Sequence, residues 1–108
     1  MAWTPVVKVW QGGTEEAKAL FGKRVRTTEA LTFSEFIAQD RDLGIQVSVK
    51  KGAIGFVGQP FGLFVIIAFP KDEKMVTTSL AALARSPKNF VSHRATWDTF
   101  QHHYEIEV

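Results

Sequence analysis

The chain has 108 residues, with 13 Lys and Arg against 11 Asp and Glu, a hydrophobic fraction of 45% and no cysteine. This composition is typical of a globular domain, and it excludes an intrinsically disordered segment, a disulfide scaffold and any site built on thiolates. A chain of this length buries roughly two-thirds of its unfolded surface, so we expect residues 1–108 to form a single globular domain.

The charge balance and the apolar runs bear on location and partners. A formal net charge of +2 requires neither a nucleic acid nor a membrane as partner. The N-terminus lacks the basic start and apolar core of a secretory signal, and the longest apolar run, residues 61–69, is too short to cross a bilayer. We therefore expect a cytoplasmic protein without a membrane partner.

The N-terminal part of the chain is expected to form a strand and then a helix. Val and Trp dominate residues 3–11 and favour a strand, which ends at two glycines. Thr14 can cap the helix that follows, with Glu15 and Glu16 placed well against the positive end of its dipole. The buried stripe of this helix would consist of Ala17, Leu20, Phe21 and, at its end, Val25.

A second helix is predicted to begin at Thr32. Thr32 and Glu35 have the spacing of a capping box, in which each side chain bonds the backbone N–H of the other residue. The apolar face of this helix would consist of Phe33, Phe36 and Ile37. Gly44 stands where a left-handed residue would end the helix.

Three strands are predicted after this helix. Residues 45–49 alternate apolar and polar side chains, which indicates a half-buried strand, and residues 53–57 form the next one. Residues 61–69 are apolar on both faces, which is typical of a central strand covered on two sides. A chain this short has few helices to cover both faces, so a subunit interface could cover one of them.

The C-terminal part completes the predicted fold. Residues 75–86 fit either a strand or a short helix, whereas Trp97, Phe100 and Tyr104 share a helical face and residues 104–108 alternate as a terminal strand. Together the elements predict an α+β fold, with a mostly antiparallel sheet and helices packed on one of its faces. A ferredoxin-like path with an extra helix and an extra hairpin strand is one option within that class.

Candidate catalytic residues are few. Asp98 and His102 are four residues apart, so on a helix they share a face and form the one acid–base pair worth testing. His93 and His103 do not complete a metal site, because zinc needs at least three protein ligands in good geometry. No serine stands in a nucleophile elbow. The sequence favours a protein without metal, cofactor or catalytic activity, and an enzyme remains an alternative.

Four glycines interrupt the predicted strands: Gly52, Gly55, Gly58 and Gly62. A phosphate-binding loop would lead from a strand into a helix, and these glycines do not. We expect them to permit tight turns, bulges or close approach of two backbones.

Residues 50–58, Lys-Lys-Gly-Ala-Ile-Gly-Phe-Val-Gly, resemble the strand signature of RNA-recognition motifs, in which a basic residue and Gly precede an aromatic, Gly, aromatic and Val. The resemblance implies that Phe56 and Trp10 stack on bases while basic side chains hold phosphates. The basic candidates are Lys18, Lys23, Arg24, Arg26 and Lys51. Single-stranded nucleic-acid binding is thus one alternative function.

Residues 80–87 resemble the helix after the third strand of small dimeric α/β-barrel proteins, which pair two sheets and enclose pockets for small organic molecules. The leading hypothesis is a non-catalytic binding module that self-associates into a dimer, because 3 Trp and 9 Phe accompany a strand that needs cover on two faces. A small-molecule-binding protein or small enzyme with an aromatic-lined pocket is an alternative, and a plain monomer stays open.

Overall fold

The structure is a computed structural model, which describes the chain except for residues 1, 39–40, 72–84 and 86. Its elements in chain order are β1 (Trp3–Pro5), α1 (Val6–Val9), α2 (Thr14–Ala19), β2 (Arg24–Thr27), β3 (Leu31–Ala38), β4 (Arg41–Val49), β5 (Ile54–Phe61), β6 (Phe64–Pro70), the 3-10 helix η1 (Pro87–Asn89), β7 (Phe90–Thr96), α4 (Trp97–His103) and β8 (Tyr104–Glu107). The open choice between strand and helix for residues 75–86, and the resemblance drawn from residues 80–87, fall largely outside the described residues.

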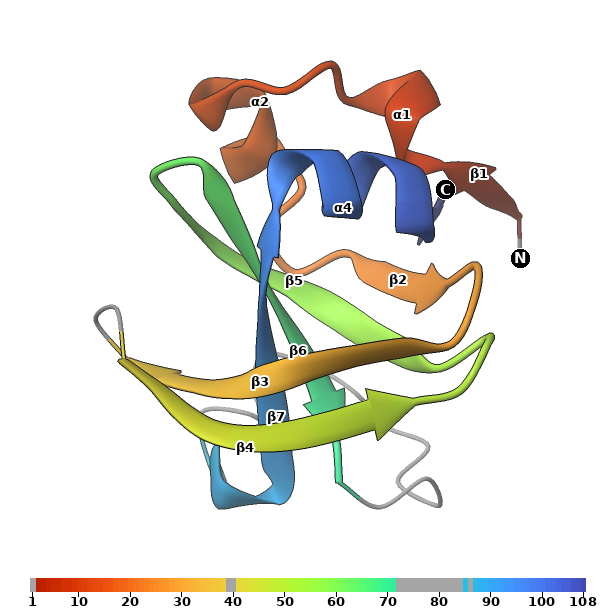
Figure 1. Cartoon of the computed structure of the whole chain (residues 1–108). Helices are drawn as coiled ribbons and strands as arrows, with labels where there is room; N and C mark the ends of the chain where they lie inside the picture. The colour runs from red at the N-terminus through yellow and green to blue at the C-terminus, as the bar shows by residue number, and fades with distance from the viewer. Residues whose placement is uncertain (1, 39–40, 72–84, 86) are drawn as a thin grey trace.

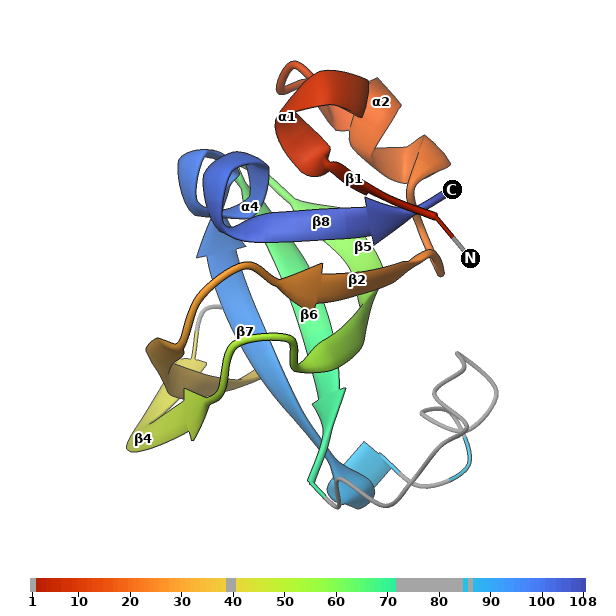
Figure 2. The same ribbon diagram turned by 90° about the vertical axis from the view of Figure 1, so that its right-hand side faces the viewer.

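The described strands form two sheets (Figures 1 and 2). Six strands pair in the order β1-β8-β2-β5-β6-β7, and β3 pairs with β4 as a separate hairpin. Every pairing among these strands is antiparallel. The predicted α+β class with a mostly antiparallel sheet is confirmed. The narrower ferredoxin-like option gains no support, because a split βαβ path places parallel strands side by side.

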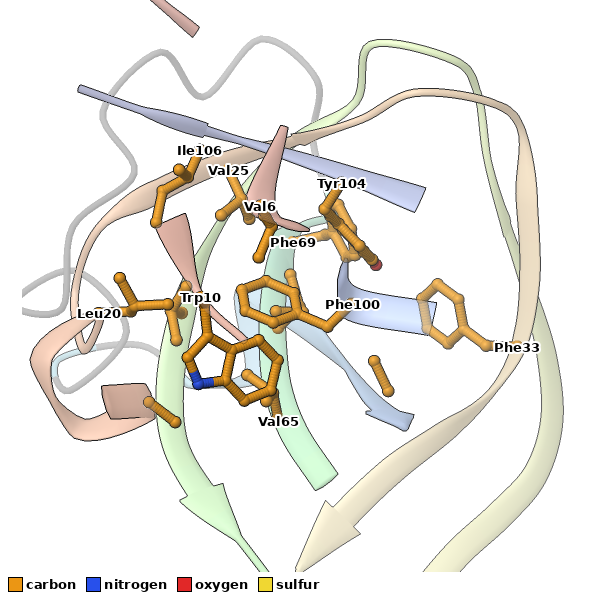
Figure 3. Packing of buried hydrophobic residues seen from close by; sticks show 14 residues of the cluster. Val6, Trp10, Leu20, Val25, Phe33, Val65, Phe69, Phe100, Tyr104 and Ile106 are labelled. Atoms are coloured by element: carbon orange, nitrogen blue, oxygen red, sulfur yellow. The ribbon is translucent and has the colours of Figure 1, made fainter. Parts of the chain in front are cut away.

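Helices α1, α2 and α4 lie together on one side of the sheet (Figure 1), as predicted. Each of them contributes a buried side chain to the main apolar cluster, which also takes side chains from β2, β5, β6 and β8. At the centre of this cluster the ring of Phe100 lies 5.3 Å from that of Trp10 and 5.7 Å from that of Tyr104 (Figure 3). These contacts join elements from both ends of the chain into one core.

The prediction of one strand over residues 61–69 is wrong, because Phe61 ends β5, Gly62 and Leu63 form a turn, and β6 begins at Phe64. Within β6, apolar residues lie on both faces, as expected. Val65, Ile67 and Phe69 lie in the main cluster. On the opposite face Ala68 is buried, whereas Phe64 and Ile66 are half-buried. The main core therefore accounts for only one of the two apolar faces.

The helix predicted from Thr32 to Gly44 is wrong, because residues 32–38 lie in β3 and residues 41–44 lie in β4. The register of the hairpin shifts between Ser34 and Phe36 and again between Phe36 and Ala38. A strand pair with such irregularities does not keep a strict alternation of its two faces. Phe33 and Phe36 are both buried, and the Thr32 hydroxyl bonds Ser48 Oγ across the hairpin at 3.1 Å. The apolar spacing of three is therefore compatible with this irregular hairpin as well as with a helix.

The first strand is shorter than predicted. It ends at Pro5, and the chain continues as the single turn α1, in which Trp10 N donates to Val6 O at 2.9 Å. Val6 and Trp10 are fully buried, and their spacing of four is that of one helix face. Helix α2 begins where predicted, but Gly13 instead of Thr14 is its N-cap residue. The helix ends at Ala19, so Val25, which was placed at the end of its buried stripe, lies instead in strand β2.

Strand β7 was not predicted from the sequence. Its inward positions, opposite Phe69, Ile67 and Val65 of β6, are Val91, His93 and Ala95. A histidine in the middle of this row hides the apolar alternation that identifies a strand. The pairing with β6 and the burial of His93 become visible only in the folded chain.

The expectation that the four glycines are structural is confirmed. Gly52 and Gly62 lie in turns with φ of 82° and 61°, a left-handed conformation that disfavours other residues. Gly58 lies where the register of β5 with β6 shifts. A Cβ on Gly55 would overlap the carbonyl oxygen of Ala68 on the neighbouring strand, so the two backbones approach closely there.

Candidate functional site

The tip of the β5–β6 hairpin carries large apolar side chains into solvent. Phe61 and Phe64 are cross-strand partners, and Gly62 and Leu63 form the turn between them. The exposed fraction is 67% for Leu63 and 39% for Phe61. The backbone of the turn is anchored to the start of α4, because Trp97 N donates to Leu63 O at 3.2 Å. The fold therefore holds an apolar side chain outward on a fixed turn.

A hollow lies beside this hairpin, between α2 and the end of β5. Its volume is about 370 Å³, and it is lined by Thr14, Lys18, Phe21, Gln59 and Pro60. Backbone hydrogen bonds tie the two walls together: Gly22 N donates to Val57 O at 2.8 Å, and Val57 N donates to Lys23 O at 2.9 Å. The hollow is thus part of the fold's framework instead of a gap between loosely placed loops.

Phe21 lines the hollow because its side chain is not buried in the core. It was predicted in the buried stripe of its helix, but its exposed fraction is 44%, whereas Ala17 and Leu20 are buried as expected. Helix α2 ends at Ala19, so the helical spacing that the prediction assumed no longer holds at Phe21. We call Phe21, Pro60, Phe61 and Leu63 the apolar end of the molecule.

The side of the hairpin that faces β3 is covered by a cation. The guanidinium of Arg94 lies 4.8 Å from the ring centre of Phe64 and 5.3 Å from that of Phe36. Phe36 also lies 6.4 Å from Phe61, ring centre to ring centre. These contacts shield Phe64 and Phe36 and leave the tip of the hairpin as the exposed part.

The residues predicted to bind nucleic acid are not brought together as such a site requires. Phe56 and Trp10 are fully buried, and the Phe56 ring packs edge-on against Phe90 at 5.8 Å. Neither ring presents a face on which a base could stack. Lys23 and Lys51 are exposed.

The basic run also meets acidic partners in the folded chain. Arg24 Nη1 lies 3.2 Å from Glu107 Oε2, and Arg26 Nε lies 2.9 Å from Glu105 Oε1. The indole ring of Trp3 covers the Arg26 guanidinium at 4.7 Å. The carboxylates of β8 therefore neutralise the two arginines of the neighbouring strand β2, whose own sequence contains no acidic residue.

Asp98 and His102 do come together, one turn apart on α4. The distance from His102 Nδ1 to Asp98 Oδ1 is 3.2 Å, and Nδ1 also lies 2.9 Å from the backbone oxygen of Asp98. Both side chains are well exposed, so water weakens any effect of the carboxylate on the imidazole. Over the residues that the structure describes, no three His, Asp or Glu side chains gather as a metal site.

A buried polar pair that the sequence did not predict lies between β7 and β8. His93 Nδ1 lies 2.8 Å from Tyr104 Oη, and the Phe33 ring stacks on the imidazole at 4.3 Å. Burial lowers the pKa of His93 to about 4 and raises the pKa of Tyr104 above its ordinary value. Both groups are therefore neutral near pH 7. The two residues lie on different strands, β7 and β8, so their spacing in the sequence does not predict that they are in contact.

Comparisons with protein-family models, with curated proteins and with solved structures found no match to this chain. Within the described ranges, no helix has the length and apolar character needed to cross a membrane.

Proposed function

We propose that this protein is a non-catalytic interaction module that self-associates into a dimer through its apolar end. The observation that supports the proposal is the exposure of Phe61 and Leu63 at the hairpin tip, directly after Gln59 and Pro60, which line a hollow together with the exposed Phe21. Clustered apolar surface of this kind marks interaction sites, whereas single exposed apolar residues are ordinary. The aromatic side chains of the apolar end belong to the residue types enriched at interface centres.

The other described groups give less support to catalysis. The Asp98–His102 pair lies in solvent on α4, and the His93–Tyr104 pair is enclosed by the core. A general base must reach the proton that it removes. A surface contact between Asp98 and His102 and a pair enclosed by the core both fit structural roles better.

Light scattering over a concentration series tests the proposal directly. We expect the average mass to rise from one chain toward two with concentration. Leu63→Asp should remove this rise, because it places a charge in the middle of the interface. Ile45→Asp is the matched control, since Ile45 on β4 is 56% exposed but lies outside the apolar end. A wild-type mass of one chain up to high micromolar concentration would contradict the proposal.

A second candidate function follows from the hollow itself. At about 370 Å³ its volume lies in the lower part of the range of ligand pockets, roughly 300–1,000 Å³. Phe21 and Pro60 offer apolar walls, and Lys18 a cation, which together suit a small aromatic carboxylate. An NMR titration with benzoate tests this use: saturable shifts confined to the hollow and weakened by Lys18→Gln would support it, and their absence would exclude it.

A further inference from the structure

We infer that in the proposed dimer the Leu63 side chain of each copy occupies the hollow of the other copy. This inference rests on the proposed function and adds the contact that would hold the two copies. The projecting leucine and the hollow belong to the same end of the molecule, because Gln59 and Pro60 of the hollow immediately precede the hairpin turn. A two-fold axis that passes between the leucine and the hollow would bring each leucine to the other copy's hollow.

The shape of the two partners supports this contact. Leu63 is the most exposed of the large apolar side chains of the apolar end, at 67%, and the bond from Trp97 N to its carbonyl oxygen fixes the turn that carries it. Binding therefore costs little additional ordering of the backbone. The hollow has a volume of about 370 Å³, enough for a leucine side chain, and Phe21 and Pro60 are among its lining residues.

Helix α2, whose Thr14 and Lys18 line the hollow, carries exposed charges of both signs that a two-fold axis can pair. The first turn of α2 carries the exposed acids Glu15 and Glu16, and Lys18 and Lys23 follow toward and beyond its end. Lys18 Nζ lies 3.2 Å from Glu15 Oε1 at the surface of one copy. When two α2 helices meet in opposite directions, the acids of one face the lysines of the other. A second copy is thus a better match than an acidic or a basic partner.

The inference predicts a large effect for a small truncation. Leu63→Ala should raise the dissociation constant of the dimer ~100-fold or more, because two leucine contacts are lost per dimer. Ile45→Ala removes a comparably exposed side chain elsewhere and should leave the constant unchanged within a factor of about two, as expected for a change outside the interface.

Disulfide trapping tests the contact itself, and the absence of native cysteine makes it specific. Leu63→Cys is mixed in equal amounts with Lys18→Cys, a variant at the mouth of the hollow, and the mixture is oxidised mildly. We expect a rapid crosslink between the two different chains. A mixture of Leu63→Cys with Ile45→Cys is the control and should crosslink only slowly. All three changed positions are exposed, and circular dichroism verifies that each variant is folded.

The outcomes separate the inference from the proposed function. A wild-type monomer at all concentrations would overturn both. A wild-type dimer in which Leu63→Cys crosslinks only to itself would place the leucines against each other on the axis, which overturns the inference and leaves the dimer standing. A dimer whose mixed crosslink is no faster than the control also overturns the inference. Rapid mixed crosslinking together with a weakened Leu63→Ala dimer supports it.

Discussion

Acid should destabilise the fold through His93. This imidazole is 9% exposed, bonded to Tyr104 and stacked on Phe33. Burial lowers its pKa from 6.5 to about 4. Above pH 6.5 the imidazole is neutral in both states and contributes no pH dependence. Below pH 6.5 the unfolded chain binds a proton at His93 and the folded chain does not. The free energy of unfolding therefore decreases as the pH is lowered, until the pH reaches the pKa of His93 in the folded chain.

The size of this effect follows from the pKa difference. One pKa unit corresponds to ~1.4 kcal/mol, so the loss is ~2 kcal/mol between pH 7 and pH 5 and ~3 kcal/mol at and below pH 4. Urea unfolding followed by tryptophan fluorescence, repeated across this pH range, measures it. The control is His93→Gln, which keeps an amide able to hydrogen-bond Tyr104 but cannot titrate there.

The comparison of the two proteins isolates this residue from every other titrating group. His93→Gln should be less stable than wild type at pH 7, but its disadvantage should shrink by ~2 kcal/mol at pH 5, because the proton uptake at this position is lost. Parallel stability curves for the two proteins would refute the reasoning, since they would show that His93 titrates alike in the folded and unfolded chain.

Three further substitutions test the fold and the surface. Gly55→Ala should cost ~1–3 kcal/mol in the free energy of unfolding, since the new methyl group meets the Ala68 carbonyl, and an unchanged thermal midpoint would contradict the close approach. Thr27→Val keeps the volume of a buried side chain but loses two hydrogen bonds of 2.9 and 3.1 Å to the turn after β4, so urea unfolding should show a loss of ~1–3 kcal/mol. His102→Ala should change stability by less than ~0.5 kcal/mol, because its contact with Asp98 is exposed; a larger loss by the same assay would show that the contact contributes more than an ordinary surface pair.

The elements predicted well are those specified by nearby residues. Helix α2 follows two glycines and begins with acids, and α4 carries Phe100 on its buried face. The Thr96 hydroxyl accepts from Thr99 N at 3.2 Å and caps α4, which is a local interaction of the same kind. The terminal strand β8 shows the alternation of buried and partly exposed residues that its sequence predicted.

The elements predicted wrongly are those in which distant residues decide the outcome. The apolar spacing of Phe33 and Phe36 is compatible with a helix or with a bulged strand, and only the pairing with β4 and packing against β7 favour the strand. The capping box at Thr32 is a weak local preference, worth about 1 kcal/mol. A hairpin's full set of backbone bonds and its buried aromatic rings outweigh it.

The candidate site was still less accessible to sequence reasoning. The exposed residues of the hairpin tip lie within a run that reads as a continuous buried strand, and one turn glycine, Gly62, is the single local sign that the run is folded in two. Phe21 and Pro60 are far apart in the chain and share a hollow only because β5 passes beside the end of α2.

By itself the sequence determined the α+β class, the positions of α2, α4 and β8, and the structural use of the strand glycines. Those features depend on periodicity, capping and backbone freedom, which act over a few residues. Only the tertiary structure decided that Phe56 is buried while Leu63 is exposed, and that β2 and β8 neutralise each other's charges. These outcomes depend on which strands become neighbours. Strand pairing is decided by contacts between segments that are distant in the sequence, so no local sequence pattern predicts it.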